Sequence, residues 1–160
     1  MIKKSNSRIF QAIYKTLAFG ALFLVLFLFF SNLKNQHKAI DSFIILNNEK
    51  ILVSIANTDY LRTLGLSGTK NLTKNTGKLF IFEYPDKYSF WMKDMNYPLD
   101  IIWINEMGII VDISSNIKPD TYPETFSPSE PVKYVLEINA NEAKKRNISI
   151  GDKIIFPGNF

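Results

Sequence analysis

The segment from residue 90 to residue 104 constrains the fold more than any other part of the chain. Its sequence, FWMKDMNYPLDIIWI, holds two β-prone runs on either side of a short polar turn. Aromatic and β-branched residues favour strands, and a turn between two such runs predicts a hairpin, here between residues 88–93 and 99–104. Alternation of side chains along each strand places Trp91 and Lys93 on one face, and the hairpin brings either Lys93 or Met92 close to Asp100. If the neighbour is Lys93, then Trp91, Lys93 and Asp100 form a polar-aromatic cluster on one face. We therefore expect a β-rich domain that carries ionisable side chains on a packed sheet.

Similar short β-prone runs recur along the chain after residue 41. We expect strands at residues 43–46, 51–55, 78–84, 88–93, 99–104, 109–113, 132–138 and 153–156. Thr58 is a suitable N-cap for a short helix that Gly65 would end, and residues 141–146 predict a second one. The proline-rich segment 114–131 excludes a central strand or a helix there. The pattern predicts a mainly β (α+β) domain with a small antiparallel sheet, curled or barrel-like, of about eight strands and two short helices.

An unbroken apolar run from Leu17 to Phe30, preceded by basic residues, is typical of a signal anchor or a signal peptide. The run is shorter than the roughly 20 residues of a membrane span, which favours a signal peptide. No small-x-small cleavage site follows it, which favours an anchor. We expect a cytoplasmic segment at 1–15, a transmembrane anchor in contact with membrane lipid at 16–33, a tether at 34–40 and an extracytoplasmic domain at 41–160. The alternative is secretion after cleavage.

The charge distribution argues against nucleic-acid binding by the domain. Six of the 19 Lys and Arg residues precede residue 39 and all 15 Asp and Glu residues follow it, so the remainder has 13 basic residues and a net charge of about −2. The early basic residues are Lys3, Lys4, Arg8, Lys15, Lys34 and Lys38. The positive net charge of the whole chain therefore belongs to its N-terminal part.

The lack of cysteine excludes disulfides, thiolate zinc sites, a cysteine nucleophile and a lipid-modified N-terminal cysteine. The single histidine, His37, lies beside the apolar run, so a histidine metal site or a Ser-His-Asp triad within the domain is excluded as well. We expect no metal and no cofactor, and we assign no catalytic residue.

Two carboxylates, Asp100 and Glu137, interrupt apolar strands, and a buried carboxylate is costly unless it is paired or hydrogen-bonded. We expect Lys93, Arg62 or backbone N–H groups to satisfy Asp100. We also expect Arg62 or Lys93 to neutralise both acids, which would leave a site that only binds. With Trp91 as a stacking face, the candidate ligand-binding residues are Arg62, Trp91, Lys93, Asp100 and Glu137, and a polar small molecule or a glycan is the expected ligand.

Two other functions remain open from the residues alone. Asp100 and Glu137 are the best candidates for a carboxylate pair, which predicts a hydrolase or lyase of the cell envelope. The long proline-rich segment 114–131 is instead suited to a contact surface, which predicts an envelope protein-interaction module.

Five stretches follow one another in an order that resembles the domain of unknown function 192 family. They are RTLGLSG from residue 62, GKLFIF from residue 77, FWMKDM from residue 90, PLDIIWI from residue 98 and YVLEI from residue 134. The similarity spans residues 43–156. The resemblance implies a small β-rich, barrel-like domain, often exported behind an N-terminal hydrophobic segment, and it implies no known activity.

Two positions depart from the family pattern. The family usually has Arg where this chain has Thr69, and Gly-Met where this chain has Gly77-Lys78. If the usual Arg contributes to a site, that site is altered in this chain.

Overall fold

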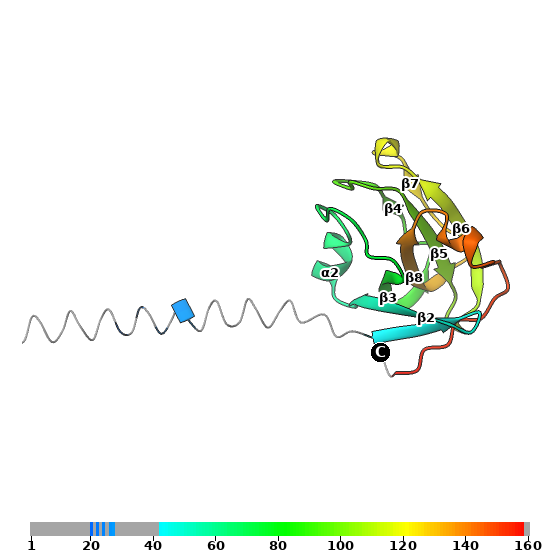
Figure 1. The fold of residues 1–160 in the computed structure, drawn as a ribbon, viewed down its shortest axis with the longest axis horizontal. Coiled ribbons are helices and arrows are strands. Elements are labelled where there is room, and N and C mark those ends of the chain that lie inside the picture. Colours follow the sequence, from blue (N-terminus) through cyan, green and yellow to red (C-terminus); the bar gives the residue numbers. More distant parts are fainter. Residues whose placement is uncertain (1–19, 21, 23, 25, 28–41, 159–160) are drawn as a thin grey trace, which may run out of the picture. The chain divides into compact units, whose positions relative to one another are not determined.

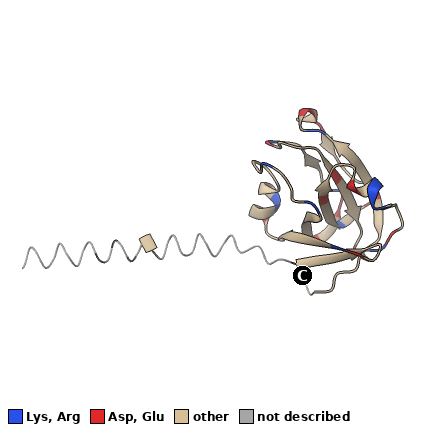
Figure 2. Ribbon diagram, viewed as in Figure 1, with Lys and Arg blue, Asp and Glu red and all other residues tan. Residues whose placement is uncertain are grey.

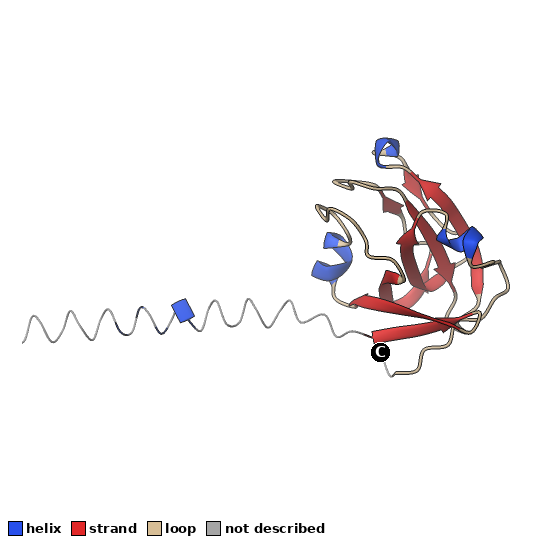
Figure 3. Ribbon diagram, in the orientation of Figure 1, coloured by secondary structure: helices blue, strands red, loops and turns tan. Residues whose placement is uncertain are grey.

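The computed structural model describes residues 20, 22, 24, 26–27 and 42–158. The chain divides into two compact units, Met1–Ala39 and Ile40–Phe160. The described part of the second unit is mainly β with two short α-helices, as the sequence predicts (Figures 1 and 3). Its strands are β1 (Ser42–Leu46), β2 (Glu49–Ala56), β3 (Thr76–Asp86), β4 (Phe90–Trp91), β5 (Leu99–Ile104), β6 (Ile110–Ile117), β7 (Thr125–Phe126) and β8 (Val132–Asn139).

Six of these strands form one sheet in the order β1-β2-β3-β8-β5-β6, and β4 and β7 form a separate two-stranded sheet. All pairs in the large sheet are antiparallel except β2 and β3, which are parallel. Parallel neighbours need a crossover, and helix α2 (Asp59–Leu64) lies in that connection. β8, the last strand in the sequence, lies between β3 and β5 in the middle of the sheet.

Both faces of the large sheet are packed, which explains why every residue of β5 is buried. On one face Ile102 and Ile104 belong to a first cluster with Leu79, Leu136 and other aliphatic residues. On the other face Ile101 and Trp103 belong to a second cluster that contains Phe80, Val135 and several partly buried aromatic rings. A strand between two apolar layers shows a continuous apolar run instead of strict alternation.

Both predicted helices are confirmed. The Thr58 hydroxyl accepts a hydrogen bond from the Leu61 N–H at 3.3 Å and caps α2, and Gly65 ends the helix with a φ of 52°. Helix α3 (Glu142–Lys145) follows Asn141, which has a left-handed backbone conformation. A 3-10 turn, η1 (Pro119–Thr121), lies in the proline-rich segment.

The predicted hairpin between residues 88–93 and 99–104 is wrong. β4 pairs with β7, with Phe90 opposite Phe126, whereas β5 lies between β8 and β6. After Met92 the chain turns away from the path of a hairpin, and Asp94 in this turn has a left-handed backbone conformation with a φ of 56°. The Asp94 carbonyl then accepts a hydrogen bond from the Gly68 N–H at 2.8 Å. Contacts with the loop after α2 thus replace the hairpin turn.

The expected barrel is not closed, and the expected last strand at 153–156 makes only isolated bridges. Ile155 bridges to Ile45 on β1, and Lys153 bridges to Ile109, next to β6. This segment therefore contacts both edges of the open sheet. The proline-rich segment contributes no central strand, as expected, because β6 is at a sheet edge and β7 belongs to the small sheet.

The expected segments at 1–15, 16–33 and 34–40 lie outside the described residues, apart from positions 20, 22, 24, 26 and 27. Among the residues that the structure describes, no helix is long and apolar enough to cross a membrane.

Candidate functional site

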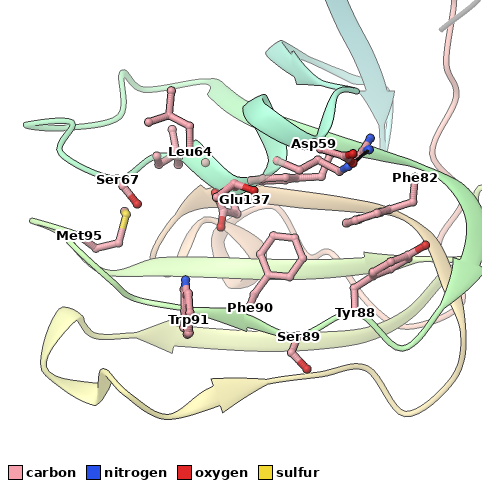
Figure 4. Close-up of a pocket in the computed structure, with 15 residues that line it drawn as sticks. Asp59, Leu64, Ser67, Phe82, Tyr88, Ser89, Phe90, Trp91, Met95 and Glu137 are labelled. Carbon is pink, nitrogen blue, oxygen red and sulfur yellow. Dashed lines mark hydrogen bonds and ion pairs between the residues drawn. The ribbon is translucent and has the colours of Figure 1, made fainter.

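A pocket of about 410 Å³ lies between α2 and the face of the large sheet that carries the second cluster (Figure 4). Its lining comes from residues 59 and 62–67 of α2 and the following loop, Phe80 and Phe82 of β3, residues 88–91 and Met95 around β4, and Glu137 of β8. Small-molecule sites commonly have volumes of about 300–1,000 Å³. The pocket is therefore large enough for a small ligand or one unit of a polymer.

Aromatic rings form much of the pocket wall, and their mutual contacts fix their orientation. The Phe82 and Tyr88 rings stack with centroids 3.5 Å apart, and the Phe80 and Phe90 rings meet edge-to-face at 4.8 Å. The Phe90 ring also meets the ring of buried Trp103 edge-to-face at 5.5 Å. Rings held by such pairs offer a ligand a preformed surface with little loss of side-chain entropy.

Glu137 is the ionisable residue at the base of this pocket. Its side chain comes from β8, where the alternation of that strand places it with the second cluster (Figure 4). The residue is 6% exposed, and its Oε2 atom has no hydrogen-bond partner. Burial raises the pKa of the Glu137 carboxyl to about 8, although the nearby charge of Lys78 acts in the opposite direction. At neutral pH the carboxyl is therefore mainly protonated.

Lys78 is the charged neighbour of Glu137, and sequence reasoning missed it. The two residues are directly opposite each other on β3 and β8, which places them on the same face. Lys78 is also buried, and burial lowers the pKa of its ammonium group while the charge of Glu137 raises it. The described residues include no ion pair between the two side chains. Cross-strand register, which the sequence did not reveal, brings them together.

Arg62, a candidate ligand-binding residue, lines the pocket, but it neutralises neither Asp100 nor Glu137. Its Nη2 atom is 2.5 Å from an Asp59 carboxylate oxygen, and its Nη1 atom donates to the Ile81 carbonyl at 2.7 Å. The guanidinium carbon also lies 5.4 Å from the centroid of the Phe82 ring. Arg62 therefore fixes α2 to β3 at the edge of the pocket.

Of Trp91 and Lys93, only Trp91 belongs to the pocket lining. Trp91 is 53% exposed and meets the Tyr122 ring edge-to-face at 6.0 Å. The Lys93 Nζ atom is 5.9 Å from the Trp91 ring centroid, and Lys93 is exposed. The predicted neutralisation of the buried acids by Lys93 is therefore wrong.

Asp100 does not belong to the pocket, and the predicted carboxylate pair is wrong for a reason of register. On β5 and β8, Ile101 is opposite Glu137, so Asp100 and Glu137 project from opposite faces of the sheet. Asp100 is fully buried and accepts hydrogen bonds from the N–H groups of Asn116, Asn141 and Ala143 at 2.7, 3.1 and 2.9 Å. Backbone N–H groups, one of the expected partners, therefore satisfy this carboxylate.

Residues 43–156 match the family described as "Uncharacterized ACR", domain of unknown function 192. The chain belongs to this family. It also resembles two crystal structures over 71% of its length. One, from Sinorhizobium meliloti 1021 and named as a candidate transcription regulator, is 30% identical in sequence, and the match covers 90% of that chain with a TM-score of 0.66. The other, a protein of unknown function from Novosphingobium aromaticivorans DSM 12444, is 28% identical in sequence, and the match covers 82% of that chain with a TM-score of 0.64. No curated protein matches the chain at a significant level.

Lys78 and Thr69, the two positions where the sequence is expected to depart from the family pattern, have different relations to Glu137. Lys78 is opposite Glu137 in the sheet. The Thr69 hydroxyl is 2.6 Å from the Tyr97 hydroxyl. Burial raises the pKa of Tyr97, the hydrogen bond to Thr69 lowers it, and the charge of Glu137 raises it.

Proposed function

We propose that the domain binds a small polar ligand, or one unit of a polymeric ligand such as a glycan, in the pocket beside α2. The unpartnered Oε2 atom of Glu137, in a pocket with aromatic walls, carries this proposal. A buried polar atom without a partner destabilises the folded chain, and such groups are found where a ligand supplies the missing hydrogen bond. The exposed ring of Trp91 in the lining offers a stacking surface for a ring-shaped ligand.

Replacing Trp91 by alanine should weaken ligand binding without disturbing the fold, because half of this side chain is exposed. We expect a loss of about threefold to tenfold in affinity for neutral oligosaccharides, the range that loss of one stacking contact produces. NMR titration of the domain with a panel of oligosaccharides measures this affinity and maps the contact. Met107→Ala is the matched control, because Met107 is 70% exposed and does not line the pocket. Equal affinity of Trp91→Ala and the parent protein, or shifts confined to residues outside the pocket, would contradict the proposal.

A hydrolase or lyase is the second candidate function, and the raised pKa of Glu137 favours it. A protonated carboxyl at neutral pH is what a general acid requires. Asp100 is not its partner, and Asp59 is the other carboxylate of the pocket lining. Enzymatic cleavage of an oligosaccharide that is lost in Glu137→Gln and kept in Asp100→Asn would favour this function over binding alone.

Transcription regulation, which the name of the Sinorhizobium relative suggests, is a weaker proposal for this chain. Basic and acidic segments are interspersed over the domain (Figure 2). After residue 39 the acidic residues outnumber the basic ones, 15 to 13. Nucleic-acid affinity depends mainly on basic groups that neutralise phosphates.

We also propose that residues 16–33 anchor the chain in a membrane, with the domain on the extracytoplasmic side. The apolar run with basic residues before it supports this proposal. In cell fractionation we expect the intact chain in the membrane fraction, and protease added from outside should digest the part beyond residue 40. A soluble mature form that begins after the apolar run would show cleavage and contradict the anchor.

A further inference from the structure

The charges of the pocket lining leave one carboxyl group without a counter-charge. Among the described lining residues, Asp59 and Arg62 form an ion pair with each other. The Arg62 guanidinium is further occupied by the Ile81 carbonyl. Glu137 is then the remaining acid, with its Oε2 atom unpartnered. A ligand that brings one positive charge and an N–H donor would satisfy this atom and balance the lining once the carboxyl ionises.

The aromatic wall is suited to the same kind of ligand. The electron-rich face of an aromatic ring attracts cations, and ammonium groups are often held by several rings together. Two rings of the lining already have a cation near them, since Arg62 lies over Phe82 at 5.4 Å and Lys93 lies near Trp91 at 5.9 Å. Among the described residues, no cation lies over the rings of Phe80, Tyr88 and Phe90. Their pocket-facing surfaces can therefore contact an ammonium group or the apolar body that carries it.

We propose that the pocket binds an organic ammonium ion, a primary amine on a ring or apolar body, with its N–H groups directed at Glu137 and its body among the aromatic rings. This inference rests on the proposed function, because it assigns a ligand class to the same pocket. Amino sugars fall within the class, and so do aromatic and aliphatic amines. Glu137 is the specificity-determining residue, and the ring pairs Phe82–Tyr88 and Phe80–Phe90 shape the wall.

Binding of such a cation is coupled to loss of the Glu137 proton to solvent. In the free protein the carboxyl has a raised pKa of about 8, so part of the binding free energy is used to ionise it below that pH. Two titratable groups interact electrostatically with Glu137, namely Lys78 on β3 and Tyr97 before β5. The other titratable groups of the pocket lining are Asp59 and Arg62 on α2 and Tyr88 before β4. Lys78 is the one that the structure identifies as shifting the Glu137 pKa.

Lys78 opposes a second cation, and this provides a sharp test of the ligand class. Among the described residues it forms no ion pair with Glu137 and is not part of the pocket lining, so a ligand amine has access to the carboxyl. Replacing Lys78 by methionine keeps most of the length of the side chain and removes its charge. Removal of that charge also raises the Glu137 pKa further, because Lys78 acts to lower it. Affinity for an ammonium ligand, compared at full ionisation of Glu137, should then rise, its pH dependence should move to higher pH, and affinity for an anionic ligand should fall.

The experiment titrates the full chain, kept in solution with a mild detergent, with three probes of one shape: benzylamine, benzyl alcohol and benzoate. We expect benzylamine to bind most tightly and to shift the NMR signals of Trp91 and of residues in the loop after α2. Below pH 8 the affinity for benzylamine should increase as the pH is raised, by up to about tenfold per pH unit, in proportion to the ionised fraction of Glu137. Glu137→Gln should reduce the affinity about tenfold or more and remove the pH dependence. Lys78→Met should move the pH dependence to higher pH and increase the limiting affinity that is reached once Glu137 is ionised.

Two results would overturn the inference in distinguishable ways. Tighter pocket binding of benzyl alcohol or benzoate than of benzylamine would reject the ammonium class and leave the pocket itself as a binding site. Absence of pocket shifts with all three probes would also reject it, and the oligosaccharide titration with Trp91→Ala would then decide the proposed function separately. Benzylamine binding that is unchanged in Glu137→Gln would place the cation elsewhere and count against the inference.

Discussion

Asp100→Ala should lower the free energy of unfolding of the domain by about 3–5 kcal/mol. The substitution leaves three buried or partly buried N–H groups without an acceptor. Each such group costs about 1–3 kcal/mol, and the three costs do not add fully. Asp100 links β5 to the end of β6, through Asn116, and to the start of α3, through Asn141 and Ala143. Urea unfolding of the 40–160 fragment, followed by far-ultraviolet circular dichroism, measures the loss.

Two variants serve as controls for Asp100→Ala. Asp100→Asn keeps the shape and one acceptor oxygen, so its loss should be smaller. Asp112→Ala removes a partly exposed carboxylate that accepts from the N–H groups of Ile113 and Ser129 at 2.8 and 3.0 Å, and it should cost about 1 kcal/mol. Unchanged unfolding of Asp100→Ala, together with loss of ligand binding, would contradict the structural role and assign this residue to function.

The stability of the domain should fall between about pH 4.5 and pH 8 because of Glu137. The folded state raises the pKa of this carboxyl from 4.5 to about 8, so the folded state binds more protons than the unfolded state within that range. Stability is therefore lost as the pH rises through the range, by a total of about 3–5 kcal/mol, and it is constant outside it with respect to this group. Unfolding free energies of the 40–160 fragment measured from pH 5 to pH 8.5 give the slope.

Glu137→Gln isolates this contribution, because the amide keeps the size of the carboxyl and does not titrate. We expect the variant to be more stable than the parent protein at pH 8 and to show no loss over the same range. Direct NMR titration of the Glu137 carboxyl provides an independent value. A Glu137 pKa at or below 5, or parallel stability curves for the two proteins, would disprove the burial argument.

A gain in stability on removing Glu137 also bears on function. A residue that destabilises the fold persists where it serves a ligand or a reaction, and stabilising replacements at such positions commonly reduce activity. Higher stability together with weaker benzylamine binding in Glu137→Gln would therefore show that the buried carboxyl lowers the stability of the fold and is needed for ligand binding.

The sequence predicted those features that depend on neighbours along the chain. Thr58 caps the start of α2 and Gly65 ends it, and both were predictable because capping involves residues within one turn of the helix. Most of the strand positions and the edge location of the proline-rich region follow equally from local composition. Of the five candidate ligand-binding residues, the structure places Arg62, Trp91 and Glu137 in the pocket lining, and whether they bind a ligand stays a prediction.

The features that sequence reasoning got wrong depend on contacts between distant residues. Period-2 alternation gives the two faces of each strand, but it does not say which strand lies beside it. The 90–104 block therefore predicted a hairpin where β8 inserts as the partner of β5. The same register places Asp100 and Glu137 on opposite faces and Lys78 beside Glu137. A pairing partner more than 30 residues away leaves no local signal in one sequence.

The central position of β8 has a consequence for the order of events during synthesis. Until residues 132–139 leave the ribosome, β1-β2-β3 and β5-β6 are two half-sheets with no hydrogen bonds between them, and each presents an unpaired edge. Contacts between residues so far apart in the chain form slowly, because long loops must close first. Most of the chain therefore has to be made before the domain can fold. During that interval the two half-sheets expose strand edges that can pair with other chains, so aggregation competes with folding until β8 is inserted.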